Sequence, residues 1–165
     1  MDRYLWAANS NGMKVSDLLW MSKGTEIPRG VLRQLVIDSK YKDHEFFEGE
    51  DWKLGNTPYQ GIHWIEDAEG KVKAAVVKMY EVNDEDSYED QFLTSDHDVV
   101  YYHFKAQRGN INKEERANRC LREQRKIGYP ILVLDGQDGG DWIYRGRYEL
   151  LLEDEAAVVL RRMRG

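Results

Sequence analysis

The sequence predicts an α+β fold in which mostly antiparallel strands form a strongly bent sheet or small barrel that carries two or three helices. Three observations predict it. Short apolar and aromatic stretches recur from residue 61 to residue 163. Helical patterns precede these stretches and interrupt them once. No internal repeat or proline-rich linker divides the 165 residues, so we expect a single domain, 1–165.

Two helices are expected before the first strand. Ser16 and Asp17 are typical of a helix start, and Gly24 ends that short helix. Apolar residues at helical spacing predict a second helix over 29–39. The acidic stretch 43–55 is interpreted as a surface loop.

A third helix lies between the strands. Asn112 is a good N-cap, and Glu115 three residues later suits a capping box. Gly128 stands where a left-handed C-terminal cap is expected. The inner stripe of this helix consists of Ala117, Cys120, Leu121 and Gln124.

The strands are predicted at 61–65, 72–80, 99–106, 131–134, 142–152 and 157–163. An acidic turn separates the second strand from the third at 83–90. In the third strand, alternation places Val100, Tyr102 and Phe104 on one face. Tyr101 and His103 then belong to the opposite face.

Composition excludes several classes of protein. The chain is 41% hydrophobic and 12% aromatic, which is too apolar for intrinsic disorder. It has no apolar run long enough for a membrane helix and no signal-like start, so we expect a soluble, cytoplasmic protein. A single cysteine, Cys120, excludes an internal disulfide and a cysteine-rich zinc site, and it is expected in the core.

The net charge of −6 is unevenly distributed. Residues 1–100 hold 11 basic and 20 acidic side chains, a net charge of −9, whereas residues 101–165 hold 13 and 10, a net charge of +3. A basic surface on an acidic domain can bind phosphates, because the local electrostatic field at the contact, and not the net charge of the domain, determines the attraction. From charge alone, a solvated helix face with ordinary ion pairs is the simpler interpretation.

Common catalytic signatures are absent: the sequence has no glycine-rich phosphate loop, no nucleophile elbow and no helical zinc motif. A metal site from His97, Asp98 and His103 has weak support, and we predict no metal and no cofactor. The acidic run 81–90 is interpreted as a solvated turn in preference to a cation site.

Aromatic residues beside carboxylates form the remaining pattern. Four tyrosines surround three acids in the sequence: Tyr80, Tyr88, Tyr101 and Tyr102 around Asp84, Asp86 and Asp90. Such a mixture suits recognition of a flat heterocycle, because rings stack on it and a carboxylate accepts a hydrogen bond from its exocyclic amine. Core tyrosines with their hydroxyls at the rim are the alternative.

The order of the segments resembles the SRA (SET and RING associated, or YDG) domain. The resemblance covers 61–163 and leaves 1–60 unmatched. It rests on Gly-Ile-His at 61–63, Tyr-Glu-Asp at 88–90, the strand 99–104, Asn-x-x-Leu at 118–121, Tyr-Pro-Ile-Leu-Val at 129–133 and Tyr-x-Gly-x-Tyr at 144–148.

The resemblance implies an SRA/PUA-like curved β-barrel flanked by two or three helices. It also implies binding of duplex DNA that carries 5-methylcytosine or 5-hydroxymethylcytosine, with the modified base flipped into a pocket. Members of this family commonly accompany a nuclease in modification-dependent restriction systems. The chain alone is therefore expected to be a reader and not an enzyme.

The resemblance also assigns roles in the pocket. Tyr88 or Tyr80 would stack on the base together with Tyr102. Asp90 or Asp84 would accept a hydrogen bond from the exocyclic amine. His103 would contact the base edge or a phosphate.

The DNA contacts come from two further segments. The loop with Thr57, Tyr59 and Gln60 occupies the place from which the family inserts a side chain into the vacated stack, and Tyr59 is the natural wedge. The phosphate contacts are assigned to basic residues of a second segment, Lys105, Arg108, Lys113 and Arg116.

Two other functions remain open at this point. A PUA- or ASCH-like RNA-binding domain would share the barrel and the basic patch. A metal-dependent nuclease would use acids of the turn 84–90, namely Asp84, Asp86 and Asp90, to hold magnesium.

Overall fold

The structure, a computed structural model, describes residues 13–41, 52–80 and 90–164. Its helices are α2 (Asp17–Trp20), α3 (Arg29–Asp38), the 3₁₀ turn η1 (Ser39–Tyr41), α4 (Arg116–Arg122) and α5 (Gln124–Ile127). Its strands are β1 (Glu26–Ile27), β2 (Lys53–Gly55), β3 (Ile62–Glu66), β4 (Val72–Met79), β5 (Gln91–Phe92), β6 (Val99–His103), β7 (Ala106–Gln107), β8 (Asn110–Ile111), β9 (Ile131–Asp135), β10 (Trp142–Glu153) and β11 (Ala157–Arg162).

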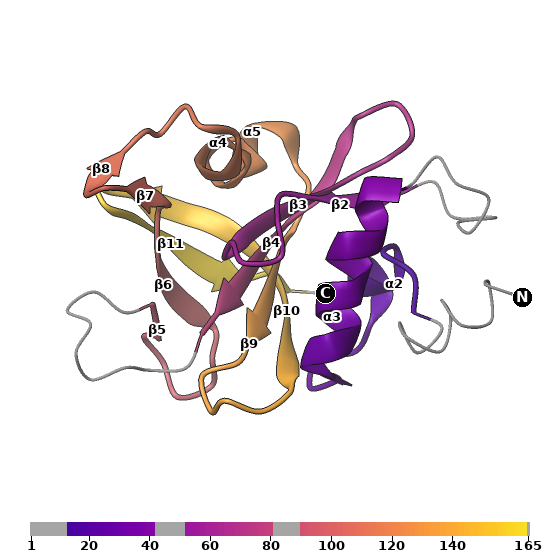
Figure 1. Cartoon of the computed structure of the whole chain (residues 1–165). Coiled ribbons are helices and arrows are strands. Elements are labelled where there is room, and N and C mark those ends of the chain that lie inside the picture. Colours follow the sequence, from indigo (N-terminus) through magenta and orange to yellow (C-terminus); the bar gives the residue numbers. More distant parts are fainter. Residues whose placement is uncertain (1–12, 42–51, 81–89, 165) are drawn as a thin grey trace, which may run out of the picture.

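One large mixed sheet organises the chain (Figure 1). Its strand order is β2-β3-β4-β9-β10-β11-β6-β5, and β1 pairs with β10 beside this path. Only the β4–β9 pair is parallel within the described residues, and the other neighbours are antiparallel. The short strands β7 and β8 form a separate hairpin. This arrangement confirms the α+β class.

The centre of the sheet is buried on both faces. Every residue of β9 is buried, and so is every residue of β4 from Ala74 to Met79. Continuous apolar runs are typical of strands that are covered on both sides. Lys78 is the exception, because this charged residue is only 4% exposed within an apolar run.

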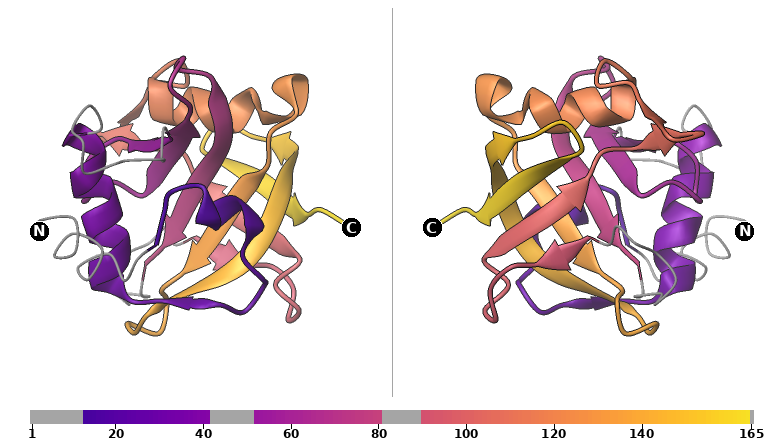
Figure 2. Two further views of the ribbon diagram at one scale, coloured as in Figure 1. Left: turned by 90° about the vertical axis from the view of Figure 1, so that its right-hand side faces the viewer. Right: turned by 90° about the vertical axis from the view of Figure 1, so that its left-hand side faces the viewer.

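Each face of the sheet carries its own core. Helices α2 and α3 pack on one face, and α4 with α5 lies over the other (Figure 1). Alternate residues of β4 and β9 contribute to the two clusters: Ala74, Val76, Leu132 and Leu134 to the first, and Ala75, Val77, Ile131 and Val133 to the second. The two side views in Figure 2 show the sheet bending between these helices.

A bulge in β10 moves its side chains from one core to the other. Tyr144 pairs with Leu134 and belongs to the core under α3. Tyr148 pairs with Ile131 and belongs to the opposite core. The register shifts by one residue between Tyr144 and Gly146, and Gly146 has a backbone φ of +118°. One extra residue reverses the side-chain alternation, and glycine adopts that φ without strain.

The sheet does not close into a barrel, which corrects the predicted topology. Its path ends at β2 on one side and at β5 on the other, and these two strands are not paired in the described part of the chain. The strong bend inferred from the sequence is present without closure. The edge strands are only three and two residues long, which limits their capacity for pairing.

Most predicted elements are confirmed, with three differences. The strand predicted over 99–106 ends at His103, and Ala106 belongs to the separate β7–β8 hairpin. The helix expected from Asn112 begins at Arg116, because the Asn112 Oδ1 atom instead accepts a hydrogen bond from the Glu114 backbone N–H (3.0 Å). Part of the expected surface loop, Lys53–Gly55, is strand β2, paired with β3. The C-terminal cap at Gly128 is confirmed by a φ of +102°.

Cys120, on the buried face of α4, packs in the core, as expected. It is 1% exposed, and burial raises the pKa of its thiol to about 12. No helix in the described ranges is long and apolar enough to cross a membrane.

His63, the histidine of the Gly-Ile-His segment, makes the fold sensitive to acid. It is 1% exposed, and its Nδ1 atom lies 2.9 Å from the Gly55 carbonyl oxygen. Burial first, and then the positive charge of Lys78, lower its pKa to about 4. The folded protein therefore keeps this imidazole neutral at pH values where an unfolded chain, with a pKa near ~6.5, takes up a proton.

We expect the free energy of unfolding to fall by about 3 kcal/mol through this group as the pH drops from 6.5 to 4, with no loss from it above pH 6.5. Urea unfolding at several pH values measures the effect. The variant His63→Gln should show a flatter profile across this window. Equal profiles for the two proteins would contradict a neutral, buried His63.

Candidate nucleic-acid interface

A carboxylate–imidazole pair stands at the end of β6. The Asp90 Oδ1 atom accepts hydrogen bonds from the His103 backbone N–H (2.7 Å) and from His103 Nδ1 (3.0 Å). The Gln137 side chain donates to the Asp90 carbonyl oxygen at 2.9 Å. The ring of Tyr101 meets the His103 ring edge-on, with the centroids 5.2 Å apart. These contacts fix Asp90 beside the aromatic strand.

The second oxygen of Asp90 is available. Oδ2 has no hydrogen bond to any described residue, and the side chain retains 23% of its exposure. Burial raises the pKa of Asp90, and the two hydrogen bonds from His103 oppose that rise. Asp90 is therefore a hydrogen-bond acceptor with one oxygen held by His103 and one that no described residue occupies.

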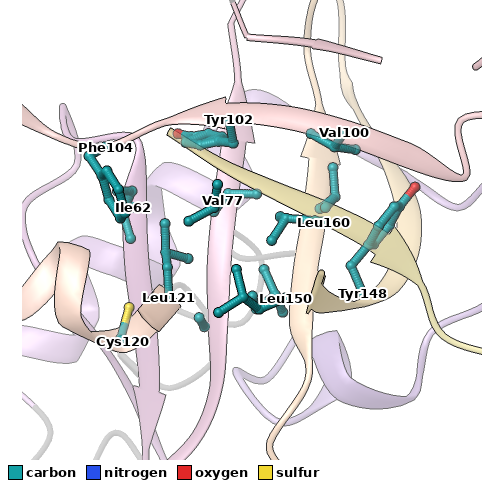
Figure 3. Packing of buried hydrophobic residues seen from close by; sticks show 14 of the residues in the cluster. Ile62, Val77, Val100, Tyr102, Phe104, Cys120, Leu121, Tyr148, Leu150 and Leu160 are labelled. Carbon is teal, nitrogen blue, oxygen red and sulfur yellow. The ribbon is translucent and has the colours of Figure 1, made fainter. Parts of the chain in front are cut away.

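Tyr102 takes the face that alternation predicts, together with Val100 and Phe104 (Figure 3). Its ring is 4% exposed and packs into the core. Its hydroxyl lies 3.1 Å from the carbonyl oxygens of both Gly61 and Lys78. The ring does not present an open face in this structure, and its assignment as a stacking wall stays a prediction.

Tyr80 lies next to this buried hydroxyl but reaches the surface. It is 42% exposed, its hydroxyl donates to the Gln60 carbonyl oxygen (3.2 Å), and its ring meets Trp142 edge-on at 5.5 Å. Gly61 separates it from Tyr102, because a Cβ atom at Gly61 would lie 3.7 Å from Tyr80 Cε2 and 2.7 Å from the Tyr102 hydroxyl. The structure thus brings two of the predicted pocket tyrosines together at Gly61.

The predicted wedge loop connects β2 with β3. A turn closes it, with the Gln60 N–H donating to the Thr57 carbonyl oxygen (3.1 Å). Tyr59 stands at its surface with 79% of its area exposed. The Lys78 ammonium donates to the Pro58 carbonyl oxygen at 3.0 Å and so ties the loop to β4. The wedge role of Tyr59 stays a prediction. A wedge must be exposed to reach the duplex, and Tyr59 is exposed.

Three of the four predicted phosphate contacts already have acidic partners. Lys105 pairs with Glu115, Lys113 with Glu153 at 3.1 Å, and Arg116 with Glu66 at 3.6 Å. Only Arg108 differs: it is exposed at the tip of the β7–β8 hairpin and has no ion pair with a described residue. An ion-paired cation offers less net charge to a phosphate, so Arg108 is the strongest of these four candidates.

Three basic residues that were not among the predicted phosphate contacts lie together in another part of the structure. Arg29 and Arg33 of α3 and Lys78 of β4 line one cleft of about 250 Å³, together with Leu32, Pro58, Tyr59, Tyr80 and Trp142. We call it the α3 cleft. Its one visible signal in the sequence is Lys78, a charged residue inside an otherwise apolar strand.

Several other predicted groups are separate or cannot be placed. Asp84 and Tyr88 lie outside the described residues, as does Asp86 of the nuclease alternative. Within the described ranges, no three histidine, cysteine or acidic side chains cluster closely enough to hold a metal ion. His97 stacks edge-on with Phe92, whereas Asp98 pairs with Arg162.

Comparison with known proteins places this geometry on a known fold. SUVH6 from Arabidopsis thaliana, in complex with SAM, matches with a TM-score of 0.52 at 17% identity, over 98% of this chain and 30% of that one. The DNA modification-dependent restriction endonuclease AspBHI matches with a TM-score of 0.51 at 14% identity, over 93% of this chain and 45% of the endonuclease. The SRA domain of SUVH5, in complex with methylated CHH DNA, gives a TM-score of 0.44 at 19% identity, over 66% and 76% of the two chains.

The fold is SRA-like, as the sequence resemblance predicted. At these identities the likeness concerns the fold alone. No protein-family model and no curated protein matches the sequence. The chain spans less than half of SUVH6 and of AspBHI.

The close approach at Gly61 generates a stability prediction. Gly61→Ala would place a methyl group 2.7 Å from a Tyr102 hydroxyl that two carbonyl groups hold in place. We expect a destabilisation of about 1–3 kcal/mol, measured by urea or thermal unfolding.

Gly30→Ala is the matched control, because nothing lies within 4 Å of a Cβ atom at that position in α3. Alanine favours a helix interior over glycine by up to about 1 kcal/mol, so this variant should be neutral or stabilised. If Gly61→Ala and Gly30→Ala changed the free energy of unfolding by the same amount, the contact between residue 61 and the Tyr102 hydroxyl would not be a tight one.

Proposed function

We propose that this chain binds duplex DNA containing a modified cytosine, 5-methyl or 5-hydroxymethyl, and flips that base into a pocket beside Asp90. The SRA-like fold supports the proposal, and so does the fold likeness to a DNA modification-dependent restriction endonuclease. In this proposal the chain is the reader of a modification-dependent restriction system, and cleavage belongs to a fused or partner nuclease.

The availability of Asp90 is the observation that carries the proposal. Its Oδ1 is occupied by His103, whereas Oδ2 has no hydrogen bond to any described residue. Cytosine presents an exocyclic amine and a ring that stacks, so an oriented carboxylate oxygen beside aromatic residues matches its edge. The backbone N–H of His103 fixes the carboxylate, which lowers the entropic cost of that contact.

The loop at Tyr59 supplies the second requirement of the proposal. Extruding a base costs a few kcal/mol and leaves a gap in the stack, which an inserted flat side chain can fill. Tyr59 is exposed, and its loop meets the aromatic strand at Gly61 through the Tyr102 hydroxyl. Wedge and pocket would thus act on the same nucleotide from neighbouring parts of the surface.

The direct test is affinity for matched duplexes that carry cytosine, 5-methylcytosine or 5-hydroxymethylcytosine at one position, measured by fluorescence anisotropy. We expect tighter binding to at least one modified duplex. Asp90→Asn replaces one acceptor oxygen with a donor, so it should lower the affinity for that duplex by roughly ten- to a hundredfold. Glu69→Gln, which removes a carboxylate from an exposed turn, should leave binding unchanged.

The same panel separates the alternatives. Equal affinity for the three duplexes and for a structured RNA would favour an RNA-binding domain and overturn the proposal. Cleavage of modified plasmid by this chain with magnesium would contradict its assignment as a reader without catalytic activity. A 2-aminopurine beside the modified cytosine should brighten on binding if the base leaves the stack.

The wedge role of Tyr59 predicts a separation of stability from binding. Tyr59 contacts Arg33 only weakly, with 3.5 Å between its hydroxyl and Arg33 Nη2. Tyr59→Ala should therefore change the free energy of unfolding by no more than about 0.5 kcal/mol. It should lower affinity for the modified duplex by about tenfold or more, since base–aromatic stacking contributes roughly 1–3 kcal/mol. A large loss of stability with binding intact would make Tyr59 structural.

A further inference from the structure

The α3 cleft concentrates positive charge that no described carboxylate neutralises. Arg29, Arg33 and Lys78 line it, and none of them has an ion pair with a carboxylate in the described part of the chain. Other basic residues, Lys105 and Arg145 among them, do have such partners. In a chain with a net charge of −6, three cations that converge on one cleft without a described carboxylate between them point to an anionic ligand.

Carbonyl groups and aromatic rings hold these cations in place. Arg29 donates to the carbonyl oxygens of Gly140 and of Gly136 (2.7 Å from Nη2), and its guanidinium lies 4.4 Å from the centre of the Trp142 ring. The Lys78 ammonium lies 5.5 Å from the Tyr80 ring and 5.8 Å from the Trp142 ring. Such contacts orient a cation without cancelling its charge.

Lys78 makes the cleft especially favourable for an anion. Burial, and then the nearby Arg29, lower the pKa of its ammonium to about 8. A buried positive charge beside a second one is stabilised when a negative group binds between them. Basic residues of α3 and β4 therefore give the cleft a positive charge that favours binding of an anion.

The size and place of the cleft favour a small anionic group. Its volume of about 250 Å³ is below the roughly 300–1,000 Å³ of pockets that enclose a whole small molecule. It suits a single phosphate group of a longer polymer. Tyr59 stands in its wall, and Arg33 Cζ lies 6.0 Å from the centre of the Tyr59 ring.

We propose that the α3 cleft binds a backbone phosphate of the DNA strand next to the point where Tyr59 enters the duplex. This inference rests on the proposed function, and it assigns the main phosphate contact to α3 and β4 in place of the largely ion-paired residues 105–116. The guanidinium of Arg33 and the ammonium of Lys78 contact the phosphate oxygens, while Arg29 supplies charge from a fixed position.

The test compares the salt dependence of duplex binding in the full chain and in Arg33→Gln, Lys78→Gln and the double variant. Each neutralised phosphate contributes about 0.9 to the slope of log affinity against log salt. We expect the double variant to lose about one unit of slope and roughly fivefold in affinity at ~0.15 M salt, on modified and unmodified duplexes alike. Arg161→Gln, an exposed and ion-paired arginine on β11, is the control and should keep the slope.

Arg33 is exposed, so its variant tests the inference even where Lys78→Gln loosens the Pro58 loop. An unchanged slope in Arg33→Gln and in the double variant, with the preference for modified DNA intact, overturns the inference and leaves the proposed function standing. A reduced slope without any such preference in the wild type supports the phosphate site and overturns the proposed function. Absence of duplex binding by the wild type overturns both.

Discussion

The bulge in β10 is the constraint on which the rest of the architecture depends. If β10 continued regularly, Tyr144 and Tyr148, four residues apart, would lie on the same face of the sheet, whereas the bulge at Gly146 places them in different cores. With it, one strand contributes to the packing under α3 and to the packing under α4. Bulges also increase the local right-handed twist of the strands that carry them.

The sequence predicted local elements better than their assembly. Alternation placed Tyr102 and Phe104 on one face of β6, and Gly128 marked a helix end, because both depend on neighbours in the sequence. Closure of the sheet depends on its total bend, which no motif reports. The start of α4 depends on a local choice at Asn112, whose side chain closes a turn instead of capping the helix.

The ion pairs of the basic residues agree with the simpler interpretation that charge alone favoured, a solvated face with ordinary ion pairs. The count placed a net charge of +3 in residues 101–165, yet a count does not reveal which side chains pair with which acids. In the structure, Lys113 and Arg116 of that segment meet carboxylates from other elements. The unpaired cations of the α3 cleft come from a helix and a strand far apart in the sequence, so only the tertiary fold brings them together. Lys78, alone among apolar neighbours, was the available clue.

The single parallel pair in the sheet has a consequence for how the chain folds. Strands β2, β3 and β4 form one antiparallel unit, and β9, β10, β11, β6 and β5 form another. Among the described residues, the β4–β9 pairing is the one strand pairing that joins the two units. That pairing closes a long loop, so its contact order is high and its formation is expected to be slow. Lys78 and Gly61 belong to the first unit, whereas Asp90 and His103 belong to the second. The residues of the proposed recognition surface therefore come together only when β4 pairs with β9. A ligand that contacts both units stabilises this pairing.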